Sequence, residues 1–255
     1  MHLGNGAITP ECAALTYAAA GAGLAMGAAA CRTVRLERFQ AAVALGCAVF
    51  ALQAINVPVT GSMSGHLVGG VLLSWLLGPA LGACTMTIVL TAQALLLGDG
   101  GLTALGANVL NMAAVPAALV AVAQRFPILA ENSQKSRFVV AGLSGLAVVL
   151  AAALIVAETA LFRSAGAETG WLDFASRMIG YHVLIGCLEA LATWSILQLA
   201  QAPIVAKRWQ ASPQFGLGIA AALVAAAMLM PISTSLPDGY EAAAEDSGMN
   251  SLLER

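Results

Sequence analysis

Long apolar segments follow one another along the whole chain, and they constrain its fold more than any other feature. An α-helix needs about 20 apolar residues to cross the hydrocarbon core of a membrane, and most of the segments are close to that length. They are 12–31, 39–57, 66–78, 80–98, 107–124, 138–160, 175–200 and 216–233. The third is short, so we expect either a re-entrant half-helix or a span completed by its glycine-rich flanks.

The composition also indicates a membrane protein. Of the 255 residues, 60% are hydrophobic and only 9% are charged, whereas about 25% are charged in an ordinary soluble domain. So few charges cannot cover a soluble protein, and the remaining apolar surface must contact lipid. Ala, Leu and Met dominate the segments and period-2 alternation is absent, which favours helices. The sequence therefore predicts an all-α, polytopic transmembrane bundle with seven to eight membrane segments.

Basic residues gather on one side of an eight-span arrangement. Eight of the eleven follow the first, fifth or seventh segment: Arg32, Arg35, Arg38, Arg125, Lys135, Arg137, Lys207 and Arg208. Three fall on the other side, together with most acidic residues: Arg163, Arg177 and Arg255. Because Lys and Arg concentrate in cytoplasmic loops, both termini should lie outside the cytoplasm.

The chain contains no segment that would form a soluble domain. We expect 1–200 to be a transmembrane domain, 201–215 a cytoplasmic linker, and 216–255 an extra transmembrane helix with an external tail. The acidic tail should be disordered or a short surface helix. No basic cluster or apolar core precedes the first segment, so we expect Met1 to be the mature terminus, protected from removal by the bulky His2.

The three histidines converge on one side of the membrane in this arrangement. His2 is external, His66 follows an external loop, and His182 lies about two turns into the seventh segment from the same side. The Met1 amine, the deprotonated amide of His2 and its imidazole can chelate one cation through fused rings. A nitrogen from His66 would complete a square plane, which suits Ni(II) or Cu(II), and less commonly low-spin Co(II). Zn(II) prefers a tetrahedron.

These two histidines also have simpler explanations. His2 can be a frayed terminal residue, and His66 can cap a helix or lie at the membrane interface. In the seventh segment, His182 and Glu189 are seven residues apart and share a helix face. A carboxylate at this depth indicates a pathway, a partner or a conformational lock. Proton relay is one interpretation, and a structural hydrogen bond to a neighbouring helix is the one we favour.

Several polar residues could support the histidines by fixing their tautomers and orientation. Two precede His66 in a loop rich in Gly, Ser and Thr, and four lie at the external end of the fourth segment and in the fifth. Turn and capping chemistry would explain the second group equally well. With the seventh-segment pair, the candidate supporting residues are Asn56, Ser64, Asp99, Thr103, Asn108, Asn111, His182 and Glu189.

Four stretches together resemble one family. They are Met1-His2 with a Gly-containing loop, NVPV from Asn56 leading to SGHLVGG from Ser64, GDGGLTALGANVLN from Gly98, and HVLIGCLEA from His182. They are similar to the CbiM/NikM proteins, the substrate-specific membrane components of energy-coupling-factor transporters for cobalt and nickel. The resemblance covers residues 1 to about 200.

The resemblance implies a square-planar metal site of the Met1 amine, the His2 amide and imidazole, and His66. It implies a bacterial or archaeal cytoplasmic membrane and three kinds of partner: a small accessory membrane subunit, a transmembrane coupling component and a pair of cytoplasmic ATPases. Borrowed ATP hydrolysis fits a chain without the P-loop pattern G-x-x-x-x-G-K-[ST]. Neither a resident cofactor, nor a nucleic acid partner, nor enzymatic activity is expected.

Two regions depart from a minimal member of this family. The segment 216–233 and the following PDGYE resemble the PDGLE segment of accessory subunits fused to nickel-type proteins, with Tyr240 replacing the usual Leu. The loop LGNGAITP from Leu3 lacks the acidic residue common in relatives, which puts that residue's role in metal entry in doubt here.

The function that we infer from the sequence is capture and uptake of a divalent metal, Ni(II) in preference to Co(II). The alternative is a standalone ion-coupled transporter in which His182 and Glu189 carry protons. A third possibility is an intramembrane enzyme that uses the same pair at a metal.

Overall fold

The structure is a computed structural model, and it describes residues 1–32, 34–130, 133–161, 170–200 and 233–253. These residues are almost entirely helical, as predicted. The main helices are α1 (Pro10–Ala30), α2 (Leu36–Gln53), α3 (Gly70–Leu77), α4 (Pro79–Leu96), α8 (Gln134–Leu161) and α9 (Trp171–Ala200). Shorter ones are α5 (Leu105–Val109), the π-helix η1 (Leu110–Ala114), α6 (Val115–Ala123), α7 (Pro127–Ala130), α12 (Gly239–Asp246) and η3 (Asn250–Leu252).

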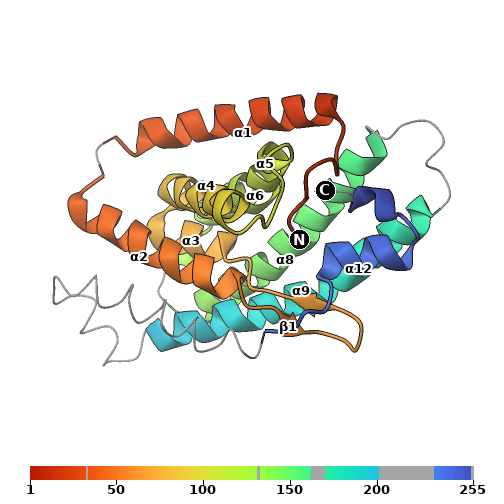
Figure 1. The fold of residues 1–255 in the computed structure, drawn as a ribbon. Coiled ribbons are helices and arrows are strands. Elements are labelled where there is room, and N and C mark those ends of the chain that lie inside the picture. The colour runs from red at the N-terminus through yellow and green to blue at the C-terminus, as the bar shows by residue number, and fades with distance from the viewer. Residues whose placement is uncertain (33, 131–132, 162–169, 201–232, 254–255) are drawn as a thin grey trace.

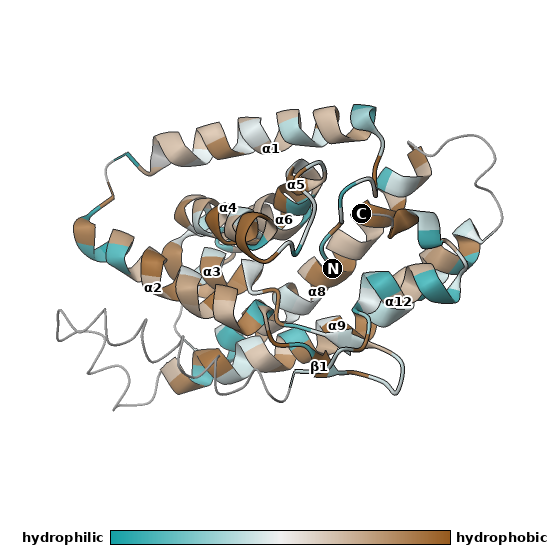
Figure 2. Cartoon of the chain, viewed as in Figure 1, coloured by the Kyte–Doolittle hydropathy of each residue, from teal (hydrophilic) through white to brown (hydrophobic). Residues whose placement is uncertain are grey.

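Within the residues that the structure describes, five helical stretches are long and apolar enough to cross a membrane. They are Pro10–Ala29, Pro79–Leu96, Leu105–Ala123, Gln134–Leu161 and Trp171–Ala200. Hydrophobic residues cover most of the long helices, whereas α12 carries several hydrophilic ones (Figure 2). The multi-pass architecture is thus confirmed, while seven to eight segments stay a prediction. The segment 216–233 and the linker 201–215 lie outside the described residues, apart from Ser233.

The short third segment forms a helix of only eight residues. Gly69 and Gly78 flank α3 with φ values of 76° and 83°. Residues other than glycine rarely adopt this backbone conformation. At about 1.5 Å per residue, α3 is too short to cross a membrane by itself. Its N-terminal end instead lies next to a small antiparallel hairpin of β1 (Val57–Pro58) and β2 (Ser64–Gly65).

Among the described helices, α8 and α9 share the most extensive contact, and α1 extends across α4 and α5 (Figure 1). The backbones of α8 and α9 meet at two glycines. A Cβ atom added to Gly145 would lie 2.6 Å from the carbonyl oxygen of Gly186, and the reverse distance is 2.8 Å. Small residues permit this approach, as is typical of membrane helices.

The C-terminal tail contains a short helix, one of the two alternatives that we expected, but this helix is packed against the bundle and does not lie on the surface. Its helix α12 packs against α9, and Tyr240 is only 2% exposed and lies edge-on to Phe174. Asp238 and Glu241 start the helix with a capping box. Tyr240 and three alanines form a buried apolar face of α12. Through this face the tail packs into the core, at the end of the bundle where the N-terminus also lies (Figure 1).

Candidate metal centre

His66 follows directly on the hairpin, in the loop between β2 and α3. A buried carboxylate from α9 holds this loop: Glu189 accepts hydrogen bonds from the backbone N–H groups of Val68 at 2.8 Å and Gly69 at 2.9 Å. Glu189 thereby caps the N-terminal end of α3, where a carboxylate is favourable. Glu189 therefore has a structural role, but its hydrogen bonds go to the loop before α3 and not, as we favoured from the sequence, to a neighbouring helix. They fix the residues next to His66.

The N-terminal segment folds back into the bundle, so Met1 and His2 are only 5% and 8% exposed. Its anchor is Asn108 of α5. The Leu3 N–H donates to the Asn108 side-chain oxygen at 2.9 Å, and the Asn108 amide donates to the Leu3 carbonyl oxygen at 3.1 Å. Thr103 adds hydrogen bonds to Asn5 and Gly6 at the exposed edge. Both polar residues thus support the segment that carries His2. Asn108 does so through the Leu3 backbone, and Thr103 through the Gly6 N–H and the Asn5 side chain.

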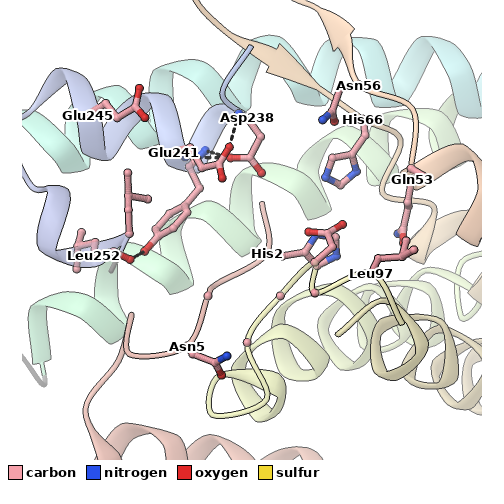
Figure 3. Close-up of a pocket in the computed structure, with 18 residues that line it drawn as sticks. His2, Asn5, Gln53, Asn56, His66, Leu97, Asp238, Glu241, Glu245 and Leu252 are labelled. Atoms are coloured by element: carbon pink, nitrogen blue, oxygen red, sulfur yellow. Dashed lines mark hydrogen bonds and ion pairs between the residues drawn. The ribbon is translucent and has the colours of Figure 1, made fainter. Parts of the chain in front are cut away.

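His2 and His66 lie together, as the sequence predicted. Their rings are stacked with centroids 5.3 Å apart and an angle of 8° between the planes, and both line a cavity of about 520 Å³ (Figure 3). Gly100 approaches His2 closely: a Cβ atom there would lie 3.4 Å from the His2 Cβ, and its φ is 88°. The loop therefore requires glycine at this point.

Each of the two histidines has a ring nitrogen that is available for a ligand. The His66 Nδ1 lies 3.1 Å from the Leu67 carbonyl oxygen. Because a carbonyl only accepts, Nδ1 must carry the hydrogen, which leaves the lone pair on Nε2. Within the described residues neither nitrogen of the buried His2 makes a hydrogen bond, although its Nδ1 is 3.1 Å from an oxygen of Asp99. Buried polar atoms normally have partners, so these nitrogens indicate a binding role.

The cavity is acidic. Four carboxylates line it: Asp99, Asp238, Glu241 and Glu245. No Lys or Arg lines it among the residues that the structure describes. Burial, together with the nearby N-terminal amine and His2, lowers the pKa of His66 to about 4. Although burial alone would raise it, contacts with His2 hold the pKa of Asp99 below its usual range. A neutral imidazole among carboxylates is suited to a cation.

Side chains alone do not complete a metal centre here. No three His, Cys, Asp or Glu side chains in the described ranges are close enough together to hold an ion. In a metal complex the missing donors would come from the main chain, because the Met1 amine and the His2 amide adjoin the His2 ring. These nitrogens and His66 form a donor set suited to Ni(II) or Cu(II). Binding one ion with both rings requires their nitrogens to turn from the stacked arrangement toward a common point.

Of the four remaining candidates, Asn56 lines the cavity (Figure 3), whereas Ser64, Asn111 and His182 do not. The Ser64 hydroxyl donates to the Leu236 carbonyl oxygen at 2.7 Å, and the Asn56 N–H donates to Ser233. Asn111 lies in η1 and donates to Glu158 at 3.1 Å, away from the cavity. His182 is fully buried and its Nδ1 is 2.7 Å from the Met178 carbonyl oxygen. It does not line the cavity.

Sequence reasoning missed several residues of the cavity wall, of which Asp238 and Gln53 are the most deeply involved. Asp238 forms an ion pair with the Met1 amine. The capping pattern D-x-x-E from Asp238 to Glu241, on the external side, could have drawn attention to it. Gln53 is 1% exposed and its side-chain oxygen has no hydrogen-bond partner among the described residues. A single glutamine ending an apolar segment was the available signal.

Known proteins are similar to this chain in sequence and in fold. The family model CbiM, described as "Cobalt uptake substrate-specific transmembrane region", matches residues 2–203. An Archaeoglobus fulgidus protein named as a fused nickel transport protein, NikMN, is 32% identical over 258 residues, which is 100% of this chain and 84% of that protein. A Haloquadratum walsbyi protein named as a metal transport protein is 34% identical over 196 residues, which is 76% of this chain and 86% of that protein.

Two solved structures are similar to this one. The crystal structure of a truncated transition metal transporter matches with a TM-score of 0.64 and 29% identity over 78% of this chain and 97% of that chain. Another transition metal transporter matches with a TM-score of 0.64 and 27% identity over 82% and 98% of the two chains. The fold and the cavity thus define a multi-pass membrane protein of the metal-transport class. The chain belongs to the CbiM family of nickel and cobalt uptake proteins.

Proposed function

We propose that the protein is the metal-capture subunit of a nickel or cobalt importer. The ion is held by the Met1 amine, the amide and imidazole of His2, and the imidazole of His66. The observation that carries the proposal is the pair of buried imidazoles at one cavity, one of them adjacent to the N-terminal amine. The ion is transported substrate and not a resident cofactor.

Nickel is the favoured substrate over cobalt. Four nitrogens that include an ionised amide form a strong-field square plane, which Ni(II) adopts more readily than Co(II). The Archaeoglobus relative, which aligns with the whole chain, is named for nickel transport. The metal would replace the contact between His2 and Asp99, and that carboxylate would remain beside it as a compensating charge.

Uptake would depend on partners of the energy-coupling-factor type: a transmembrane coupling component, a pair of cytoplasmic ATPases and an accessory membrane subunit. In this arrangement the acidic cavity faces the outside, where the metal enters. Release inward requires a second state of the centre with lower affinity, since only differential binding moves a conformational equilibrium.

Transport by this chain alone is the competing function. In the structure both Glu189 oxygens accept backbone hydrogen bonds from the loop that follows His66. Carrying a proton on Glu189 would disturb these hydrogen bonds. Purified protein in vesicles separates the two functions. Metal accumulation driven by a proton gradient without any ATPase would support the standalone transporter and contradict the coupled one.

The N-terminal amine provides the sharpest test of the proposed centre. One residue added before Met1 moves the amine away and breaks the chelate rings, so tight Ni(II) binding and the visible band of the square-planar complex should disappear. The matched control adds the same residue after Arg255 and should bind normally. Intact mass must first show that Met1 is the terminus. Unchanged binding after the N-terminal extension would exclude this centre.

A further inference from the structure

The C-terminal segment from Leu236 to Asp246 connects the parts of the structure that build the cavity. The Ser64 N–H donates to the Pro237 carbonyl oxygen at 2.8 Å and its hydroxyl to Leu236, which attaches the segment to the loop two residues before His66. At the other end, the Tyr181 hydroxyl on α9 donates to Asp246 at 2.6 Å. The segment is therefore fixed on both sides of Asp238.

Asp238 uses its two carboxylate oxygens for different purposes. Oδ1 accepts the N–H groups of Tyr240 at 2.8 Å and Glu241 at 2.9 Å, and so starts α12. Oδ2 accepts from the Met1 amine. Because Oδ1 fixes the carboxylate to a packed helix, Oδ2 is held in one place. The position of the amine is thereby set by α12, 237 residues away along the chain.

This contact can persist when a metal is bound. Coordination removes one proton from the ammonium group and one from the His2 amide, and both leave to solvent. The coordinated amine keeps two N–H bonds, so one can still donate to Oδ2 while the lone pair points to the metal. A divalent ion with one ionised amide carries a net charge of about +1, and a buried charge needs a partner of opposite sign. Asp238 is a carboxylate in direct contact with a ligand atom.

We propose that Asp238 is a positioning residue of the metal centre: it aims the Met1 amine at the metal and balances the charge of the bound complex. The inference rests on the proposed function, and it assigns to the C-terminal segment a direct part in metal capture.

The test replaces Asp238 by Asn in the full-length protein. Asn has the same shape and is as good an N-cap as Asp, so D238N should keep α12 while losing the charge. The matched control is D246N, the same change in the same helix. Asp246 contacts Tyr181 and Arg177 and does not line the cavity. A general loosening of α12 would affect both variants.

Two measurements follow. In Ni(II) titrations D238N should bind about 10- to 100-fold more weakly, the range for residues that orient metal ligands, and its visible band should move to longer wavelength as amine ligation weakens. In metal-free protein, pulse acylation of the N-terminus, read by mass spectrometry, should be several-fold faster in D238N. The control D246N should resemble the wild type in both measurements.

The outcomes separate this inference from the proposed function. If the wild type binds Ni(II) and D238N matches it in affinity and spectrum, the positioning role is wrong while the metal centre stands. Equal losses in D238N and D246N also overturn the positioning role. If the wild type binds no metal, the proposed function fails and this inference fails with it, even where the acylation rates differ.

Discussion

At the scale of single residues, the site depends on keeping an imidazole neutral inside the protein. His66 is 9% exposed, and the lowered pKa of about 4 means that the folded protein resists protonating it. Its lone pair is therefore ready for a metal through the whole neutral range. Protons compete instead at the amine and at the amide, so metal affinity should decrease as the pH falls.

The same shift predicts how stability depends on pH. The pKa of His66 is depressed from 6.5 to about 4, so between these values the unfolded chain binds more protons than the folded one. Stability should therefore fall as the pH is lowered through this window. Thermal unfolding of metal-free protein between pH 7 and about pH 4 measures this, and H66Q should show a shallower decline. Identical slopes for the two proteins would contradict the prediction.

Single residues also show what sequence reasoning can reach. His2 and His66 were singled out because the terminal dipeptide can chelate a cation and because the S-G-H stretch resembles the CbiM/NikM family, and the structure places both at one cavity. Asp238 was not, because its importance arises from a contact with Met1 across nearly the whole chain, and no local pattern encodes such a pairing. Asn111 was grouped with the supporting residues by proximity in sequence, whereas the helix geometry turns it toward Glu158.

At the scale of elements, the loop that carries His66 depends on α9. Replacing Glu189 by Gln leaves one acceptor oxygen for two N–H groups, so one hydrogen bond to a charged group is lost. We expect E189Q to lose about 2 kcal/mol of stability and to bind Ni(II) more weakly. Thermal unfolding and metal titration measure the two effects, with E11Q at an exposed position of α1 as the control. Equal behaviour of E189Q and E11Q would show that the capping contact is unimportant.

The contact between α8 and α9 gives a matched pair of glycine substitutions. Gly145→Ala places a methyl group against the Gly186 carbonyl oxygen, whereas Gly142→Ala in the same helix meets nothing within 4 Å. The first should destabilise by about 1–3 kcal/mol, and the second should be neutral or stabilise by up to about 1 kcal/mol. The thermal midpoints of the two variants measure the difference. A Gly145→Ala midpoint as high as that of Gly142→Ala would mean that the helices can separate freely.

The elements were predictable to the extent that local sequence determines them. Long apolar runs gave α1, α4, α8 and α9 to within a few residues. The short α3 was foreseen as unusual, and its flanking glycines explain its length. A short helix in the tail was foreseen as one alternative, but its burial was missed because its low hydrophobicity suggested solvent exposure. The small apolar face of α12 becomes stabilising only when it packs against α9.

At the scale of the whole molecule, the distribution of basic residues predicts which way the protein faces. Both ends of the chain should be external, with the acidic cavity open to incoming cations. An epitope added after Arg255 should bind antibody on intact spheroplasts. Labelling only after the membrane is permeabilised would reverse the orientation, and it would place the cavity on the cytoplasmic side.

The meeting of the two ends of the chain has a consequence for biosynthesis. The Met1 amine is synthesised 237 residues before Asp238, its ion-pair partner. The contact between them can therefore form only after the chain has been made and inserted as far as residue 238. A chain that terminates before Asp238 would present both histidines but leave the amine without its partner.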